Sequence, residues 1–426
     1  MPVTHRLVIA AVLGVLGAAA LPTVAVAVPV PVSVLVTDDP ALPYTERVSV
    51  GRGGTQFEGA SFGAEITDGY AGGVAYTTNA PAAADDTNGV SDAMLGSAVA
   101  SRTSRDGKPG NGPSREASSC GRFTAFVSEA TDLTSNSPTD GRTAVYLRNH
   151  TVGKIGRETF GYKGVEFEHV SDPRISQDCQ WLTFVGTLPS TPDHVEQSRV
   201  YRIKVYDASI EPVSDVAPDG SRAAGRPSIS ADGRYIAYQY GVPHPGGPAN
   251  SSDIYVRDME TGTLEKATVA PGGGEADRES TGPVISADGR KVAFTSYASN
   301  LAHGDTNKSA NVFVRDLDAH RTRLVKGAGK NVYTSEAALS GDGNFVAYVQ
   351  GSLKKPDAAH SIHLLDLATG TTQLVNVATG GGASEYSADN PSVNTDGSAV
   401  AFDSLSADLV AGDTNGAPDV FVRHLR

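Results

Sequence analysis

The chain of 426 residues has few cysteines, few aromatic side chains and too few basic residues to balance its acids. It contains 2 cysteines and 1 tryptophan, and aromatic residues make up 7% of it. Neither cysteine lies near the amino terminus, which excludes a lipid-modified cysteine at that end. Because rings are scarce, we expect packed interfaces built mainly from alanine, valine and isoleucine.

The chain also lacks an excess of positive charge. It has 35 basic and 48 acidic residues, a net charge of −13 at neutral pH. Phosphate backbones and anionic membrane surfaces repel such a protein, so we expect neither nucleic acid nor a membrane as a partner. The acidity is compatible with a bound cation, with a basic protein partner, or simply with solubility.

Long apolar runs are absent except at the start of the chain. Arg6 precedes an apolar run at residues 7–20, and Ala25-Val26-Ala27 has the small-residue pattern of a cleavage site. This pattern is typical of a secretory signal peptide at residues 1–27, with a membrane anchor as the alternative. Cleavage would leave 34 basic and 48 acidic residues, a net charge of −14. We therefore expect an exported protein, periplasmic or extracellular, with a Pro/Val linker at residues 28–44 and no membrane insertion after cleavage.

A short segment recurs along the chain. Ile-Ser-Ala-Asp-Gly-Arg at residues 229–234 returns at residues 285–290, and looser copies occur elsewhere. The equivalent anchor positions are Asp68, Cys120, Asp178, Asp232, Asp288, Asp342 and Asp396. Their spacings are 52, 58, 54, 56, 54 and 54 residues. A regular period of this size is typical of a solenoid or a propeller.

Each repeat has the pattern of four strands. In the copy at residues 224–268, β-branched and aromatic runs flank Asp232-Gly233, a hairpin signal because glycine accepts the positive φ of the turn. A polar loop and the alternating pattern of residues 254–258 follow. Apolar spacing of period 3.6 is missing, so helices are not expected. Four strands per repeat predict an all-β fold, a seven-bladed β-propeller of four-stranded antiparallel blades over residues 45–426.

The last repeat needs a strand from elsewhere in the chain. It ends with its third strand at residues 419–423, whereas residues 45–51 match residues 372–377, a fourth strand, in character. We predict that this N-terminal strand closes the last blade, because an open ring would expose unpaired strand edges.

These repeats resemble those of the TolB-like, WD-repeat-like β-propellers of bacterial envelopes. The resemblance is carried by Pro-Ser-Ile-Ser-Ala-Asp-Gly-Arg-Tyr-Ile-Ala-Tyr at residues 227–238 and Asn-Val-Phe-Val-Arg-Asp-Leu at residues 311–317. It extends over roughly residues 45–426. The resemblance implies a propeller that acts through protein partners.

The two cysteines occupy nearly the same place in neighbouring repeats. Cys120 replaces the aspartate of its hairpin turn, and Cys179 replaces the glycine after Asp178. Equivalent turns of adjacent blades are close enough for a disulfide, which export would favour. Two buried free thiols are the alternative.

Three loops between second and third strands carry an Asp-Thr-Asn pattern. Oxygen ligands at alternating positions of a short loop suit calcium, whereas the same side chains also cap turns through their own backbone. Calcium is therefore a possible cofactor, and capping of the loops is the alternative. The candidate metal ligands are Asp86, Asn88, Asp92, Asp305, Asn307, Asp413, Asn415 and Asp419.

Further acidic residues lie in the links between blades, which share one face of a propeller with these loops. We expect a ligand face there, with a solvated acidic face as the alternative, made by Glu275, Asp277, Glu279, Glu385 and Asp389. Charges on inner strands would line the central channel or pair with each other: Glu116 and Arg174 align with Ser228 of another copy, and Glu65 aligns with them less clearly.

No catalytic motif stands out. His360 and His363 are the only close histidine pair, and we interpret them as part of a solvated loop. The leading interpretation is a monomeric, non-catalytic binding or scaffold protein with an envelope or extracellular protein partner. A hydrolase or lyase acting on glycans or esters is the rival, and a carbohydrate-binding module that uses Tyr297, Tyr333 and Tyr386 is a third reading. A tight cluster of carboxylates with histidine at the channel mouth would favour the enzyme.

Overall fold

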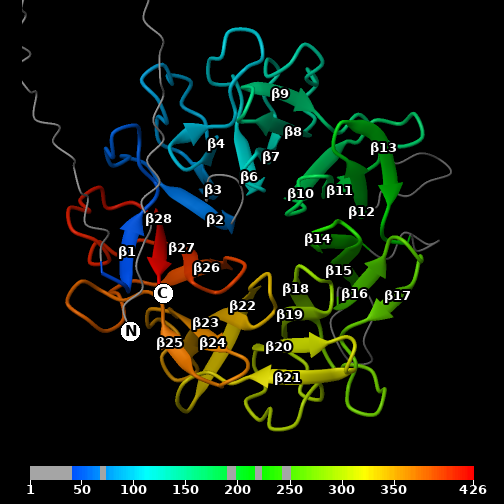
Figure 1. Ribbon diagram of the computed structural model, residues 1–426, viewed down its shortest axis with the longest axis vertical. Coiled ribbons are helices and arrows are strands. Elements are labelled where there is room, and N and C mark those ends of the chain that lie inside the picture. Colours follow the sequence, from blue (N-terminus) through cyan, green and yellow to red (C-terminus); the bar gives the residue numbers. More distant parts are fainter. Residues whose placement is uncertain (1–40, 68–72, 190–197, 216–222, 242–250) are drawn as a thin grey trace, which may run out of the picture. The chain divides into compact units, whose positions relative to one another are not determined.

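The computed structural model describes residues 41–67, 73–189, 198–215, 223–241 and 251–426. Within them, 28 strands form seven four-stranded antiparallel sheets, arranged as the blades of a ring (Figure 1). The predicted seven-bladed propeller is confirmed. In this part of the chain, no helix is long and apolar enough to cross a membrane. The expected signal peptide, the linker up to residue 40 and the turn at Asp68 lie outside the described residues.

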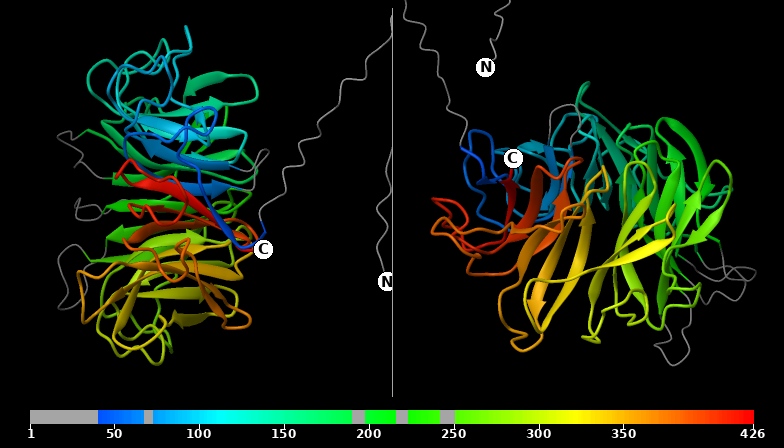
Figure 2. Two further views of the ribbon diagram at one scale, coloured as in Figure 1. Left: turned by 90° about the vertical axis from the view of Figure 1, so that its left-hand side faces the viewer. Right: turned by 60° about the horizontal axis from the view of Figure 1, so that its bottom comes forward.

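The chain builds the blades in order around the ring, and the first strand of each blade lies next to the central channel (Figures 1 and 2). Blades 1 and 2 contain β2 (Ser61–Thr67), β3 (Gly73–Thr78), β4 (Asp92–Leu95), β5 (Ala98–Val99), β6 (Ser114–Ser119), β7 (Phe123–Ser128), β8 (Ala144–Asn149) and β9 (Lys154–Arg157). Blades 3 and 4 contain β10 (His169–Ile175), β11 (Trp181–Thr187), β12 (Ser198–Lys204), β13 (Asp207–Pro212), β14 (Ala224–Ile229), β15 (Tyr235–Gly241), β16 (Ser252–Asp258) and β17 (Leu264–Lys266).

Blades 5 to 7 follow the same plan. They contain β18 (Ser280–Ile285), β19 (Lys291–Ser296), β20 (Asn311–Asp316), β21 (Arg321–Val325), β22 (Val332–Leu339), β23 (Phe345–Ser352), β24 (Ser361–Asp366), β25 (Thr372–Leu374), β26 (Ala388–Val393), β27 (Ala399–Ser404), β28 (Asp419–His424) and β1 (Tyr44–Arg47). Hairpin turns lie at one end of the ring, which we call the turn face. Loops between second and third strands lie at the other end with the links between blades, and we call that end the loop face.

The ring closes as predicted. Strand β1 pairs antiparallel with β28 and so supplies the fourth strand of blade 7. Side chains reinforce this pairing: Arg423 donates to Thr45 Oγ1 at 3.0 Å, and Ser49 Oγ donates to the buried Asp419 at 2.5 Å. The strand begins at Tyr44, one residue before the predicted boundary.

The recurring Ser-Ala-Asp-Gly segment builds the turn between the first two strands. In blade 4, Ser230 Oγ donates to Asp232 Oδ1 at 2.7 Å, and the same carboxylate accepts the Arg234 N–H at 3.0 Å. Gly233 has φ 74°, and a Cβ there would lie 2.2 Å from the Trp181 ring of blade 3. The glycine is therefore required twice, by its left-handed backbone and by the side chain packed on it. Trp181, the single tryptophan of the chain, therefore packs between blades 3 and 4.

The few aromatic residues are concentrated between second and third strands. Stacked cross-strand pairs recur in six blades: Phe126–Tyr146, Phe184–Tyr201, Tyr238–Tyr255, Phe294–Phe313, Tyr348–His363 and Phe402–Phe421. Such pairs stabilise a sheet beyond the area they bury. The blade interfaces are thus alanine- and valine-rich, as expected, but each of these six blades is centred on a ring pair that the composition did not indicate. His363 belongs to this layer, and burial lowers its pKa.

Every first strand has a β-bulge at the same place. The pairing register shifts between first and second strands in all seven blades. The first bulge residue has positive φ each time: Gly63, Glu116, Asp172, Arg226, Gly282, Glu336 and Asn390. Proline follows it in four blades, at Pro173, Pro227, Pro283 and Pro391. Proline is tolerated there because a bulge position need not donate to the sheet.

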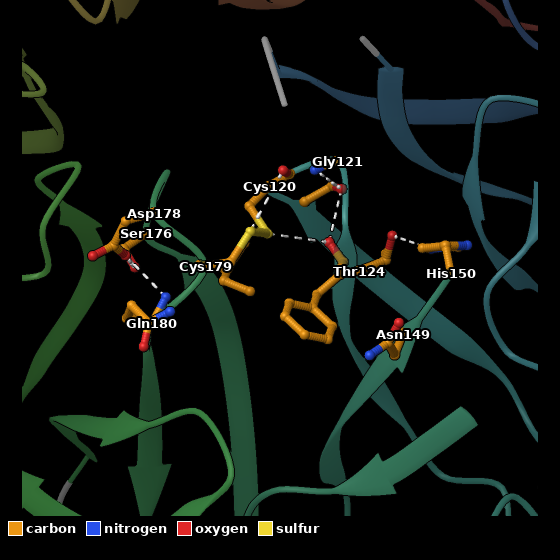
Figure 3. The surroundings of a disulfide bond; sticks show 12 residues. Cys120, Gly121, Thr124, Asn149, His150, Ser176, Asp178, Cys179 and Gln180 are labelled. Atoms are coloured by element: carbon orange, nitrogen blue, oxygen red, sulfur yellow. Dashed lines mark hydrogen bonds between the residues drawn. A yellow bond between two sulfur atoms is a disulfide. The ribbon is translucent and has the colours of Figure 1, made fainter. Parts of the chain in front are cut away.

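Cys120 and Cys179 form the predicted disulfide (Figure 3). Their Cα atoms are 5.7 Å apart, and the bond joins the inner turns of blades 2 and 3. Cys179 has φ 61°, which is the conformation of the glycine it replaces in the repeat. Where other junctions place a side chain on a glycine, this junction is therefore linked covalently.

Removing this bond should lower stability. A cross-link between residues 59 positions apart restricts the unfolded chain, and the chain-entropy model puts that effect at about 4 kcal/mol. We expect the Cys120→Ser/Cys179→Ser variant to unfold at a lower temperature than the parent in a circular dichroism melt. Reductant should lower the parent's midpoint towards that of the variant and leave the variant unchanged. Equal midpoints of parent and variant would contradict a stabilising role.

Candidate functional site

The seven first strands surround a polar cavity of about 780 Å³ on the axis of the ring. It lies at the bulges, towards the loop face. Its charged lining residues are Glu65, Glu116, Asp172, Arg174, Arg226 and Glu336. Towards the turn face the free space falls to about 150 Å³, and Gln177 Nε2 of blade 3 donates across to Thr395 Oγ1 of blade 7 at 2.8 Å. The channel therefore has the form of a cup whose wide part lies towards the loop face.

The bulges bring charged side chains to the cavity wall and also link neighbouring blades. Glu116 Oε2 accepts the backbone N–H of Asp172 at 2.7 Å, and Glu336 Oε2 accepts that of Asn390 at 2.8 Å. Each glutamate thus uses one oxygen to hold the bulge of the next blade. Burial raises the pKa of both carboxyls.

The structure places Glu65, Glu116 and Arg174 on this wall, but not in one shared slot. Glu65 and Arg174 occupy the same register position in their first strands, each paired with the second strand of its own blade. In blade 2 this position is occupied by Ser118. Glu116 stands two residues earlier, at the bulge, because the hairpin of blade 2 is two residues shorter: Ser119 pairs with Thr124, whereas Ile175 pairs with Leu182 in blade 3. Arg174 Nε lies 3.8 Å from Glu65 Oε2, and Ser118 Oγ donates to Glu65 Oε1 at 2.7 Å. Burial nevertheless raises the pKa of Glu65.

Beside the cavity, blades 6 and 7 form a hydrogen-bonded chain of three side chains. Tyr333 Oη lies 3.0 Å from His360 Nε2, and His360 Nδ1 lies 3.1 Å from Asp389 Oδ1. Burial, with the charges of Asp389 and Glu336, raises the pKa of the Tyr333 phenol. A protonated phenol donates to Nε2, which leaves the imidazole proton on Nδ1 facing Asp389.

This chain was not foreseen from the sequence. The sequence paired His360 with its neighbour His363, whereas the structure pairs it with residues 27 and 29 positions away. No local spacing signals such a contact, because it joins the first strand of one blade to a loop and to the first strand of the next. Asp389 and Tyr333 were named separately, as a ligand-face acid and as an aromatic contact.

The other expected ligand-face acids lie apart from this chain. Glu275, Asp277 and Glu279 belong to the link between blades 4 and 5, and Glu385 belongs to the link between blades 6 and 7. Asp277 accepts the Ser299 N–H at 2.8 Å, and Glu275 pairs with Lys266. These acids share the loop face but do not converge on one point.

The Asp-Thr-Asn loops of blades 5 and 7 hold nitrogen donors between their oxygens. In blade 5, Asn311 Nδ2 donates to both Asp305 oxygens at 3.1 Å and to Asn307 Oδ1 at 2.9 Å. In blade 7, Arg47 Nη1 lies 3.5 Å from Asp413 and 3.7 Å from Asp419, and Asn415 Nδ2 donates to Asp419 at 3.0 Å. Among the described residues, no group of three or more histidine, cysteine, aspartate or glutamate side chains is placed to hold a metal.

In blade 1, no cation among the described residues is bonded to the buried Asp92. Asp92 accepts from Ser101 Oγ at 2.5 Å, but Arg102 turns to Asp85, at 2.8 Å. Burial and the nearby Asp86 carboxylate raise the pKa of Asp92 to about 7. Asn88 donates to the Gly110 carbonyl of the following link at 2.6 Å and so ties the loop to blade 2.

Comparison with known proteins identifies the fold and no family. No family model matches the chain, and no curated protein matches it. A solved structure of oligogalacturonate lyase from Vibrio parahaemolyticus is similar at TM-score 0.53 and 13% identity, over 90% of this chain and 97% of that one. A prolyl endopeptidase structure is similar at TM-score 0.51 and 15% identity, over 82% of this chain and 45% of that one.

TolB structures are also among the similar solved structures, as the repeats suggested. TolB from Acinetobacter baumannii is similar at TM-score 0.39 and 13% identity, over 74% of this chain. The chain spans 62% of the length of that protein. At these identities the similarity is one of propeller fold and does not extend to activity.

Neutralising Asp92 should change how stability depends on pH. The unfolded carboxyl loses its proton near pH 4 and the folded one near pH 7, so the free energy of unfolding falls as pH rises between these values. We expect the stability of Asp92→Asn relative to the parent to increase by roughly 2 kcal/mol between pH 5 and pH 8, which is a few degrees in melting temperature. Asparagine already stands at the equivalent Asn311 of blade 5.

Asp253→Asn is the matched control. Asp253 holds the same strand position in blade 4 but lies 2.7 Å from Lys266 Nζ, so its neutralisation should lower the melting temperature at pH 8. An unchanged pH profile in Asp92→Asn would contradict the raised pKa.

Calcium should not stabilise the protein through the loops of blades 5 and 7, because the structure shows these two loops capped by nitrogen donors. The cation would have to displace the Asn311 amide or the Arg47 guanidinium. We expect equal melting temperatures in calcium and in chelator. A rise in calcium that disappears in Asp413→Asn would instead support the metal-binding alternative.

Proposed function

We propose that the protein is an exported, non-catalytic binding module of the cell envelope or the extracellular space, and that its partner enters the cup on the loop face. The observation that carries the proposal is the charge of the cavity wall. Four carboxylates, those of Glu65, Glu116, Asp172 and Glu336, face two guanidinium groups, those of Arg174 and Arg226. A basic segment of a protein partner complements such a wall, and a cavity of this size holds one or two side chains.

The rigidity of the wall supports binding by a preformed site. The bulges are held by hydrogen bonds from blade to blade, so the cavity needs no rearrangement to admit a ligand. The secretory signal expected at residues 1–27 and the disulfide support a location outside the cytoplasm.

The wall can be neutralised without breaking its backbone contacts. In Glu116→Gln/Asp172→Asn, the glutamine carbonyl still accepts the N–H of residue 172, so the loss is one of charge. We expect a partner captured from the organism's envelope or culture fluid, then purified, to bind this variant at least tenfold more weakly by calorimetry.

Glu260→Gln/Asp318→Asn is the control, because it removes two exposed acids from the turn face. It should bind within twofold of the parent. If both variants bound the partner equally weakly, the loss would be explained by net charge alone, and this would contradict a binding site in the cavity.

A second candidate function is acid–base catalysis beside the cavity. It is favoured by the Tyr333–His360–Asp389 chain, in which Asp389 orients the imidazole and His360 Nε2 faces the phenol. Side chains in this order can move a proton from the phenol to the imidazole, as a nucleophile–histidine–carboxylate chain does. Glycans and esters are the substrates to screen, and turnover that is lost in both Tyr333→Phe and His360→Gln would replace the binding proposal.

A further inference from the structure

An arginine recurs two residues after the aromatic position of the third strand in four blades. These equivalents are Arg148, Arg257, Arg315 and Arg423, opposite Thr124, Ile236, Val292 and Val400 of the second strands. The repetition allows one copy to be compared with another. Among the described residues only Arg257 of these four has a carboxylate partner, so its surroundings can be compared with those of Arg315.

In blade 4 the arginine is fully neutralised by the preceding blade. Arg257 Nη2 lies 3.0 Å from Asp215 Oδ1, Nε donates to the Val213 carbonyl at 3.1 Å, and Nη1 donates to Gly262. Asp215 follows Ser214, whose hydroxyl accepts the N–H of Val200 in the third strand of blade 3.

In blade 5 that carboxylate is missing. Thr268 of the preceding blade takes the place of Ser214, so Val269 stands where Asp215 stands. Arg315 is 7% exposed, its Nη1 makes one long hydrogen bond of 3.3 Å to Thr322, and its Nε has no hydrogen-bond partner among the described residues. Burial lowers its pKa, yet a guanidinium remains charged in a protein. A buried cation without a bonded counter-ion costs several kcal/mol, by order of magnitude.

A cavity of about 690 Å³ lies in front of this arginine, between blades 4 and 5. The fourth strands of blades 5 and 7 differ at one position opposite the third strand. In blade 7 this residue is Arg47 of β1, which ion-pairs with Asp413, and in blade 5 it is Leu324 of β21. The cavity is bounded on one side by the Gly-rich link at residues 269–273 and on the other by β21.

The lining of this cavity is cationic in a protein that is acidic overall. Arg315, Arg321, Arg323, Lys326, His303 and His320 line it, and no carboxylate does. Lys326 Nζ lies near Gly304, next to His303, whereas Arg323 is drawn away by the Leu367 carbonyl of blade 6. The acids close by are Glu265, 3.6 Å from His320, and Asp316 beside Arg315 in β20.

We propose that this cavity binds the phosphate or sulfate group of a small organic ester, with the Arg315 guanidinium as the principal contact. Guanidinium groups bind tetrahedral oxyanions through paired hydrogen bonds, and Lys326 adds a second positive charge. The volume exceeds that of a bare ion and suits a ligand of sugar size. The site is independent of the axial cavity and goes beyond the function proposed for it.

The proposal is tested by calorimetry on the purified full chain at constant ionic strength. The probes are inorganic phosphate, inorganic sulfate, glucose 6-phosphate and acetate. We expect saturable binding of one equivalent of a tetrahedral anion, tighter than acetate and tightest for the ester. Comparing the affinities for phosphate and for sulfate shows which of the two oxyanions the cavity prefers.

Two variants identify the site. Arg315→Gln should weaken the binding at least tenfold, and Val269→Asp should do the same by placing a carboxylate where Arg257 has Asp215. The second variant covers the case in which the first does not fold. Arg148→Gln is the matched control: it removes the repeat-equivalent arginine of blade 2, which also lacks a carboxylate partner among the described residues, and should leave affinity within twofold. No saturable binding, acetate binding as tight as phosphate, or full affinity in both site variants would overturn the proposal.

Discussion

The closed ring depends on how the inner strand of each blade meets the next. At the turn face, backbone bonds run from blade to blade, as from Ala231 N to Ala287 O at 3.0 Å and from Ala287 N to Gly341 O at 2.8 Å. At the bulges, carboxylates accept the N–H groups of the following blade. A blade cannot bury both of its faces alone, so these contacts and the stacked rings stabilise the fold only when all seven blades are present. Strand β1 is then the element on which closure rests, because without it β28 is an open edge.

The same constraint shapes the cavity. A bulge turns a residue out of the sheet, and seven bulges at one level line the axis with whatever side chains the repeats supply there. Five of the seven are not glycine, so the left-handed backbone is retained in spite of its steric cost. The hydrogen bonds that Glu116 and Glu336 make explain part of this, since each joins two blades. Charge on the wall and cohesion of the ring are therefore properties of the same residues.

Departures from the repeat mark the places with individual character. Cys120 and Cys179 replace a turn motif with a covalent bond. Asp92 keeps a buried carboxyl where blade 5 has an amide and blade 4 has a lysine partner. Arg315 is a buried cation beside Val269, where the equivalent Arg257 has Asp215. In each case the backbone of the repeat is kept while the side chains at one position differ from those in other blades. A fold that serves many functions acquires a particular function through such local differences.

The sequence alone determined the number of blades, their strand order and the closing strand, because each follows from a period and from local turn chemistry such as Asp232-Gly233. It predicted the disulfide with two free thiols as the alternative, and the structure decided between them. It also indicated that Glu65, Glu116 and Arg174 face the axis, since inner strands are few and their register is nearly regular. Tertiary structure decided the rest. The Nε of Arg315 is buried without a hydrogen-bond partner among the described residues. The shorter hairpin of blade 2 shifts Glu116 against Arg174, and Tyr333 meets His360 and Asp389 only across a blade junction. These contacts join different blades, and apart from equivalent turns such as those of Cys120 and Cys179 the repeat pattern does not show which side chains meet there.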